Sequence, residues 1–136
     1  MKHLLIALAF SASTAMAEEW TIEEGEEVTA RSPVFNGNSW LNFQCTKNSE
    51  MFSVIFKEQK KPRVLTVSYS VDLGPVQRIP AHIGHERTVA ELLDMKDFTA
   101  EGGYFDIQIQ GEIYTFSLSG AESKIKKARK ICKGKK

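Results

Sequence analysis

The sequence predicts an α+β domain: a mostly antiparallel β-sheet, a short middle helix, and a C-terminal helix tied to the sheet by a disulfide. Short runs in which apolar and polar residues alternate are typical of strands with one buried face. The segment before the C-terminus instead repeats its apolar residues at the spacing of an amphipathic helix. Two cysteines, one in an early strand and one in that helix, are placed to join the two elements.

Residues 1–17 have the form of a signal peptide. Lys2 precedes a short apolar run at residues 4–10, and Ala15-Met16-Ala17 is an A-x-A cleavage site. The run is shorter than the roughly 20 apolar residues that a transmembrane helix needs, and the alternative is a buried N-terminal helix. We expect cleavage after Ala17, and a periplasmic or secreted protein that begins at Glu18 and has no transmembrane segment.

Residues 18–136 have the length of a single globular domain. Lys2 is the one basic residue of the 1–17 segment, which holds no acidic residue, so the rest of the chain carries 17 basic and 17 acidic residues. A neutral chain lacks the basic excess expected of a general nucleic-acid binder. We therefore expect no nucleic-acid partner.

Six segments have the composition and alternation of strands. In the third of them, Leu65, Val67 and Tyr69 share one face and are separated by Thr66 and Ser68. Turn-forming residues separate neighbouring segments, and the last two segments are predicted to form a hairpin. The predicted strands are residues 40–45, 51–56, 64–71, 76–79, 104–109 and 112–118, with turns at 46–49, 74–75 and 110–111.

Residues 86–95 are predicted to form the short middle helix. Val89, Leu92 and Leu93 make an apolar stripe at helical spacing. Thr88, followed three residues later by Glu91, fits a capping box at its start.

The last element is the best-defined helix in the sequence. Ser119 can cap it, with Glu122 three residues later completing a capping box. Ala121, Ile125, Ala128 and Cys132 recur on one narrow face, so that Cys132 should point into the core.

Cys45 and Cys132 are predicted to form a disulfide. An even pair of cysteines in an oxidising compartment is normally oxidised, and closing so long a loop contributes about 4–5 kcal/mol in the chain-entropy model. The alternative is two free thiols used for redox or metal chemistry. Neither cysteine belongs to a C-x-x-C motif, which disfavours that alternative.

The two ends of residues 18–136 carry opposite charges. Glutamates dominate before Arg31, whereas lysines and arginines dominate after residue 120. Both ends can be solvated faces, or the basic end can dock on an anionic partner. For the second reading the candidate contacts are Lys133, Lys135 and Lys136.

Catalytic or metal chemistry has little basis in the sequence. His82 and His85 stand as H-x-x-H beside Glu86, but zinc needs three or four converging ligands, and both histidines are otherwise exposed loop residues. We keep His82 and His85 as candidate partner contacts and predict no enzyme, no catalytic residue and no cofactor. Trp20 and Trp40 are either half-buried core residues or interface anchors.

Two stretches carry a family resemblance. Residues 114–121, Tyr-Thr-Phe-Ser-Leu-Ser-Gly-Ala, followed by a helix that ends at Cys132, resemble the C-terminal motif of VasI-like proteins, which are small exported bacterial proteins associated with type VI secretion. Residues 41–45 resemble their first cysteine-bearing strand, and residues 71–74 resemble a short segment in which an aspartate follows a strand. The resemblance implies a link to a secretion system and supports the Cys45–Cys132 pair. It implies no catalytic residue.

These observations favour a non-enzymatic accessory or binding protein of the bacterial cell envelope, with a protein partner and a link to a secretion system. The main alternative is a periplasmic inhibitor or immunity-type protein that blocks a hydrolase or toxin. An inhibitor often inserts a loop into its target, and residues 75–86 are the predicted loop.

Overall fold

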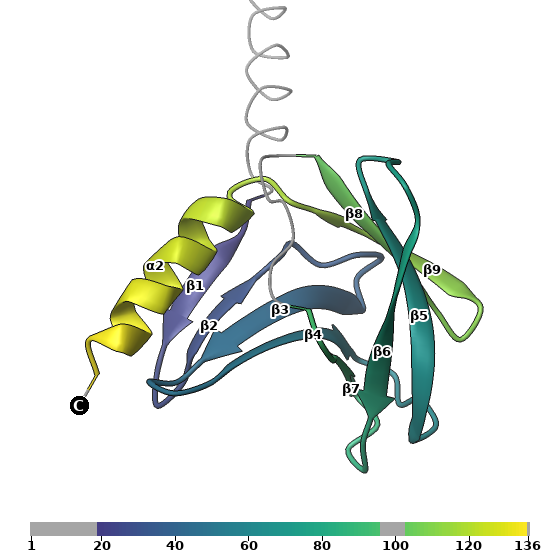
Figure 1. The fold of residues 1–136 in the computed structure, drawn as a ribbon, viewed down its shortest axis with the longest axis horizontal. Helices are drawn as coiled ribbons and strands as arrows, with labels where there is room; N and C mark the ends of the chain where they lie inside the picture. Colours follow the sequence, from purple (N-terminus) through teal and green to yellow (C-terminus); the bar gives the residue numbers. More distant parts are fainter. Residues whose placement is uncertain (1–18, 96–102, 136) are drawn as a thin grey trace, which may run out of the picture.

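The computed structural model describes residues 19–95 and 103–135 (Figure 1). These ranges hold one helix, α2 (Ala121–Lys133). It is neither long enough nor apolar enough to cross a membrane. The strands of the same ranges are β1 (Thr21–Glu24), β2 (Val28–Arg31), β3 (Ser39–Cys45), β4 (Glu50–Phe56), β5 (Arg63–Val71), β6 (Gln77–Ile83), β7 (Val89–Leu92), β8 (Tyr104–Ile109) and β9 (Glu112–Ser117).

The strands form one antiparallel sheet in the order β1-β2-β3-β4-β7-β6-β5-β8-β9, which confirms the predicted α+β class. Consecutive strands pair as hairpins except at two places: β4 pairs with β7 and not with β5, and β8 pairs with β5 and not with β7. Because β7 pairs with both β4 and β6, it joins the two halves of the sheet into one.

The core lies inside a strongly curved sheet. Phe35, from the β2–β3 loop, meets the rings of Tyr114 and Phe116 with centroid distances of 6.1 and 6.0 Å, and Phe56 of β4 meets Tyr114 at 5.3 Å. Strands from opposite ends of the sheet therefore share one apolar interior.

Trp20 belongs to this core and is not an exposed anchor. Its side chain is 1% exposed, and its indole Nε1 donates a hydrogen bond of 2.6 Å to the Ser117 carbonyl. The Trp20 backbone N–H donates to the Ser119 carbonyl at 3.0 Å. These two bonds tie the segment before β1 to the segment after β9. Trp40, on β3, is half-buried.

The predicted middle helix is wrong, because residues 89–92 form strand β7. Ala90 pairs with Val54 on one side and with Ile83 on the other, so the segment completes two ladders. The buried residues are Ala90 and Leu92, two apart, as a strand requires. The local pattern fits the period of a helix and that of a strand, and hydrogen bonding of residues 89–92 to β4 and β6 favours the strand.

The N-terminal hairpin β1–β2 was not predicted. Its glutamates suggested only a solvated face, but Val28 and Ala30 alternate with exposed or half-buried neighbours and are fully buried. The sixth strand is also longer than predicted: β6 extends to Ile83, whereas the sequence indicated residues 76–79.

Helix α2 confirms the predicted inward face. Ala121, Ile125, Ala128 and Cys132 are buried against the sheet. The predicted Ser119 cap is wrong: Gly120, with a φ of 80°, precedes the helix, and no side chain caps it. The helix starts directly after Gly120, whose left-handed backbone conformation glycine adopts without strain.

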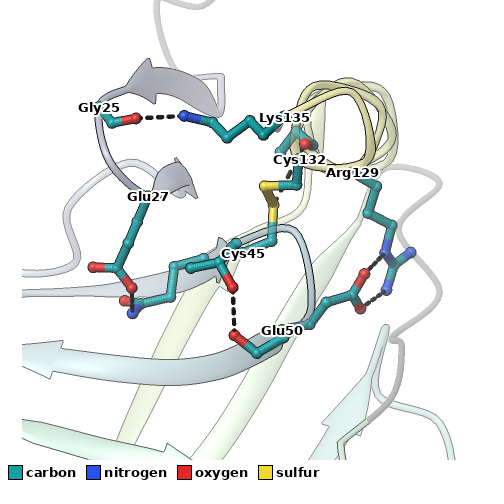
Figure 2. Close-up of a disulfide and its surroundings, with 11 residues drawn as sticks. Gly25, Glu27, Cys45, Glu50, Arg129, Cys132 and Lys135 are labelled. Atoms are coloured by element: carbon teal, nitrogen blue, oxygen red, sulfur yellow. Dashed lines mark hydrogen bonds and ion pairs between the residues drawn. A yellow bond between two sulfur atoms is a disulfide. The ribbon is translucent and has the colours of Figure 1, made fainter.

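The predicted disulfide is present. Cys45 of β3 and Cys132 of α2 are bonded, with Cα atoms 6.2 Å apart (Figure 2). Nearby, the Arg129 guanidinium donates to both carboxylate oxygens of Glu50, at 3.0 and 3.1 Å. The covalent bond and the paired hydrogen bonds hold α2 on the edge of the sheet.

Candidate interaction site

The two candidate histidines are exposed and separate from the candidate lysines. His82 lies on β6, opposite Val64 and Glu91 in the neighbouring strands, and His85 lies in the β6–β7 turn. Within residues 19–95 and 103–135, no group of three His, Cys, Asp or Glu residues is placed to hold a metal ion.

Two of the candidate lysines, Lys133 and Lys135, lie at the end of α2. Lys133 is the last helical residue and is exposed. Lys135 donates from its Nζ to the Gly25 carbonyl at 2.8 Å, so it fastens the C-terminal segment to the β1–β2 turn (Figure 2). Lys136 lies outside the described residues. Figure 1 places the end of α2 and the β6–β7 turn in different parts of the molecule.

Among the described residues, only the turn between β5 and β6 has two consecutive non-glycine residues at positive φ. Asp72 and Leu73 both have positive φ values, 51° and 59°, and the Gly74 N–H donates to the Val71 carbonyl at 2.9 Å. This is the pattern of a type I′ turn, whose central positions normally hold Asn, Asp or Gly. A leucine in the left-handed region costs about 1 kcal/mol because its Cβ crowds the following carbonyl.

The start of β8 holds this turn rigidly. The Tyr104 N–H donates to the Asp72 carboxylate at 2.8 Å, and the Asp72 N–H donates to the Tyr104 carbonyl at 2.9 Å. The Asp72 carboxylate packs on Gly103, whose φ is 77° and where a Cβ atom would collide with it. Only glycine therefore fits at position 103 while Asp72 keeps this position.

The turn presents apolar side chains to solvent. Leu73 is 88% exposed and Val76 is 67% exposed, and Tyr104, beside the turn, is 57% exposed. We call these three residues the apolar tip. The turn projects next to the start of β8 in Figure 1. Single exposed apolar residues are common on proteins, but this leucine is also held in a strained conformation that the core does not require.

A groove of about 340 Å³ continues from the apolar tip across the outer face of β5 and β8. It begins at Val76 and ends at Ile113, and Arg78 and Asp106 lie along it. Ser68, Ser70 and Gln108 also line it, so it offers hydroxyl and amide groups between two apolar ends. An apolar anchor beside a polar surface is the usual composition of a protein contact site.

A second pocket, of about 90 Å³, contains a cation from the chain itself. The Lys60 ammonium lies 5.3 Å from the Phe56 ring centroid and 5.8 Å from that of Tyr114, and it donates to Glu112 at 2.7 Å. Burial lowers the pKa of Lys60, but hydrogen bonds and charge interactions with Glu112 and Tyr114 outweigh it and raise the pKa above 10.5. Lys60 fills this pocket and joins the segment after β4 to Glu112 and Tyr114 of β9.

The loop predicted at residues 75–86 is a loop only at its two ends. The predicted loop at residues 75–86 is mostly strand β6, in which Ala81 and Ile83 are buried. Turns flank this strand on both sides, at residues 72–76 and 84–88. The first of them was indicated by the Asp-Leu-Gly-Pro sequence after an alternating run, which predicts a turn but not the sign of φ at Leu73.

A scan of protein-family models, a search of curated proteins and a search of solved structures each found no match to this chain.

Proposed function

We propose that this chain is an exported, non-enzymatic binding protein of the bacterial cell envelope, an accessory to a larger assembly, whose contact element is the apolar tip. The resemblance of residues 114–121 to VasI-like proteins is the reason to seek that assembly among secretion-system components.

Two features support export. The signal-peptide pattern at residues 1–17 belongs to the sequence and lies outside the described residues. The Cys45–Cys132 disulfide is a bond that persists in oxidising compartments such as the periplasm and is rare in the reducing cytosol.

The observation that carries the proposal is the strained, exposed leucine. Leu73 contributes little buried area, yet it occupies a left-handed position that destabilises the free protein. Backbone strain of this kind concentrates at functional sites. The hydrogen bonds between Asp72 and Tyr104 fix the turn in advance, so a partner that takes up Leu73 does not have to order a flexible loop.

The test is affinity capture from the cell-envelope fraction with residues 18–136 as bait, with and without Leu73→Asn. Asparagine tolerates the left-handed region, so the variant should be more stable than the parent by about 1 kcal/mol in chemical unfolding. Its recovery of partner should nevertheless fall by about tenfold or more, as expected for loss of an interface anchor.

Val64→Thr is the matched control. Val64 is 71% exposed on β5, and threonine keeps the β-branched shape while adding a hydroxyl. Partner recovery should not change in this variant. Equal recovery by the parent and Leu73→Asn would contradict the proposal, and so would an equal loss in Val64→Thr.

An inhibitor is the second candidate, and the rigidity of the same turn favours it. The left-handed turn cannot lie in a protease cleft as an extended substrate-like segment, so an inhibitor of this form would plug its target with Leu73. Capture distinguishes the two candidates. A single hydrolase or toxin recovered in equal amount, with its activity blocked, supports the inhibitor, whereas several envelope components support the accessory role.

A further inference from the structure

The solvent-facing side of α2 is mostly lysine, and its other exposed residues are Glu122 and Ser123. Lys126, Lys127, Lys130 and Lys133 are all exposed. At 3.6 residues per turn they fall on one arc centred opposite the buried face of the helix. We call these four residues the lysine arc. It extends about 10 Å along the helix axis, at 1.5 Å per residue.

Like charges lie close together along the arc, and Glu122, the one acidic residue of α2, is at helical spacing only from Lys126, four residues later. Lys126 and Lys130 are four residues apart, and Lys127 and Lys130, like Lys130 and Lys133, are three apart, which are spacings at which like charges destabilise a helix. Within the described ranges, no ion pair involves an arc lysine, whereas Arg129 is bound by Glu50. The helix dipole favours only the lysines of the last turn, Lys130 and Lys133.

The glutamates of the N-terminal hairpin leave the arc accessible. Glu23 pairs with Arg31, and Glu27 accepts a hydrogen bond from Gln44. Gln44 precedes Cys45 on β3 and so faces the other side of the sheet from the one on which Cys45 meets α2, and Glu27, which is bonded to Gln44, lies on that other side. The hairpin's exposed acids closest to the end of the helix are Glu24 and Glu26, next to the turn that Lys135 contacts.

The composition of the arc favours a diffuse anionic surface over a protein or a nucleic acid. Protein interfaces are anchored by Trp, Tyr and Arg and are depleted in Lys, and the arc contains none of those anchors. Single-stranded nucleic acids are bound with aromatic stacking, which the arc also lacks. Lysine is a compact point charge on a flexible stem, and it suits a surface whose charges have no fixed geometry.

We infer that the lysine arc of α2 docks on the anionic headgroups of a phospholipid bilayer. The disulfide and the Arg129–Glu50 pair fix the helix, so the arc meets a flat surface as a preformed row of charges. The contact involves no insertion, because the arc has no apolar residue to bury in the acyl region. This inference is independent of the apolar tip, which lies on another part of the molecule.

The test is co-sedimentation of residues 18–136 with phosphatidylcholine vesicles that contain either no anionic lipid or roughly 30 mol% phosphatidylglycerol. Binding should require the anionic lipid and should disappear at about 0.5 M NaCl, where screening shortens the range of the attraction. Each lysine near an anionic surface is worth about a factor of five in partitioning, so replacing all four by glutamine should lower binding by more than about 100-fold.

The control removes four exposed cations from other elements: Lys57, Lys61, Arg63 and Arg78, each replaced by glutamine. It has the same net charge as the arc variant and should retain most of the binding. The paired change Glu24→Gln and Glu26→Gln should strengthen binding, because it removes the acids nearest to the end of the arc. Circular dichroism and a thiol assay verify that each variant keeps its fold and its disulfide.

Absence of binding to the anionic vesicles would overturn the inference, as would an equal loss in the arc and control variants. Polyglutamate and single-stranded DNA, tested at the same salt concentration, separate the remaining sources of negative charge. Tighter binding to either polymer than to the vesicles would replace the lipid by an acidic protein or a nucleic acid as the partner.

Discussion

Leu73 and Lys60 show how single residues in this chain combine opposing effects. Leu73 lies in a backbone conformation that leucine disfavours, and most of its side chain is in water. Lys60 keeps its charge in a mostly buried position, 13% exposed, because Glu112 and two aromatic rings stabilise it. The sequence does not reveal either situation, since both depend on segments that only the fold brings close.

Lys60→Met is expected to lower the free energy of unfolding by up to about 1 kcal/mol at pH 8, the usual range for an ion pair near the surface. Methionine retains most of the apolar stem, so the change isolates the charge. The pKa of Lys60 is raised in the folded protein. Its charge therefore stabilises the fold below about pH 10.5, and that contribution is lost as the pH rises through the higher folded-state pKa.

Chemical unfolding of the parent and Lys60→Met at pH 8 and at about pH 11.5 checks this dependence. The difference between the two proteins should shrink at the higher pH. A difference that stays constant or grows would show that the contribution of Lys60 is packing and not charge.

At the scale of elements, the secondary structure could be predicted where the spacing of apolar residues fits either a helix or a strand, but not both. The helical phase of Ala121, Ile125, Ala128 and Cys132 left a single inward face, and the predicted partner of Cys132 was correct. Strand β7 was missed because Val89, Leu92 and Leu93 fit a helix as well as Ala90 and Leu92 fit a strand. Pairing with β6, and with β4 more than thirty residues earlier in the sequence, stabilises the strand.

Reduction of the Cys45–Cys132 bond should lower the free energy of unfolding by about 2–5 kcal/mol, since the bond closes a loop of 87 residues in the unfolded chain. The effect should appear first in α2, which has no capping side chain and rests on β1, β2 and β3. Hydrogen exchange before and after reduction measures this, with the β5–β6 hairpin as the internal reference. Unchanged protection of α2 after reduction would contradict the role assigned to the bond.

For the whole molecule, the fold class could be predicted but the order of the strands could not. Alternation identifies strands and their buried faces, and it carries no information on which strands lie side by side. The insertion of β7 between β4 and β6 is such a case. The site was missed for a related reason: the rigidity of the β5–β6 turn comes from Gly103 and Tyr104, about thirty residues away, which local turn signals do not include.

The two proposed surfaces give the molecule two separate contacts. The apolar tip lies at the turn between β5 and β6, which are interior strands of the sheet, and the lysine arc lies on α2, which packs on β1, β2 and β3. A binding protein of the cell envelope would then meet a protein partner with one surface and a bilayer with the other.

The most direct test of the proposed tip contact is photo-crosslinking with benzoylphenylalanine in place of Leu73, with the same replacement at Val64 as the reference. Residues 18–136 carrying either probe are irradiated with the cell-envelope fraction, and the adducts are identified by mass spectrometry. A discrete adduct from position 73, with none from position 64, is the predicted result. No adduct from position 73, or the same adducts from both positions, would contradict the assignment of the β5–β6 turn as the contact element.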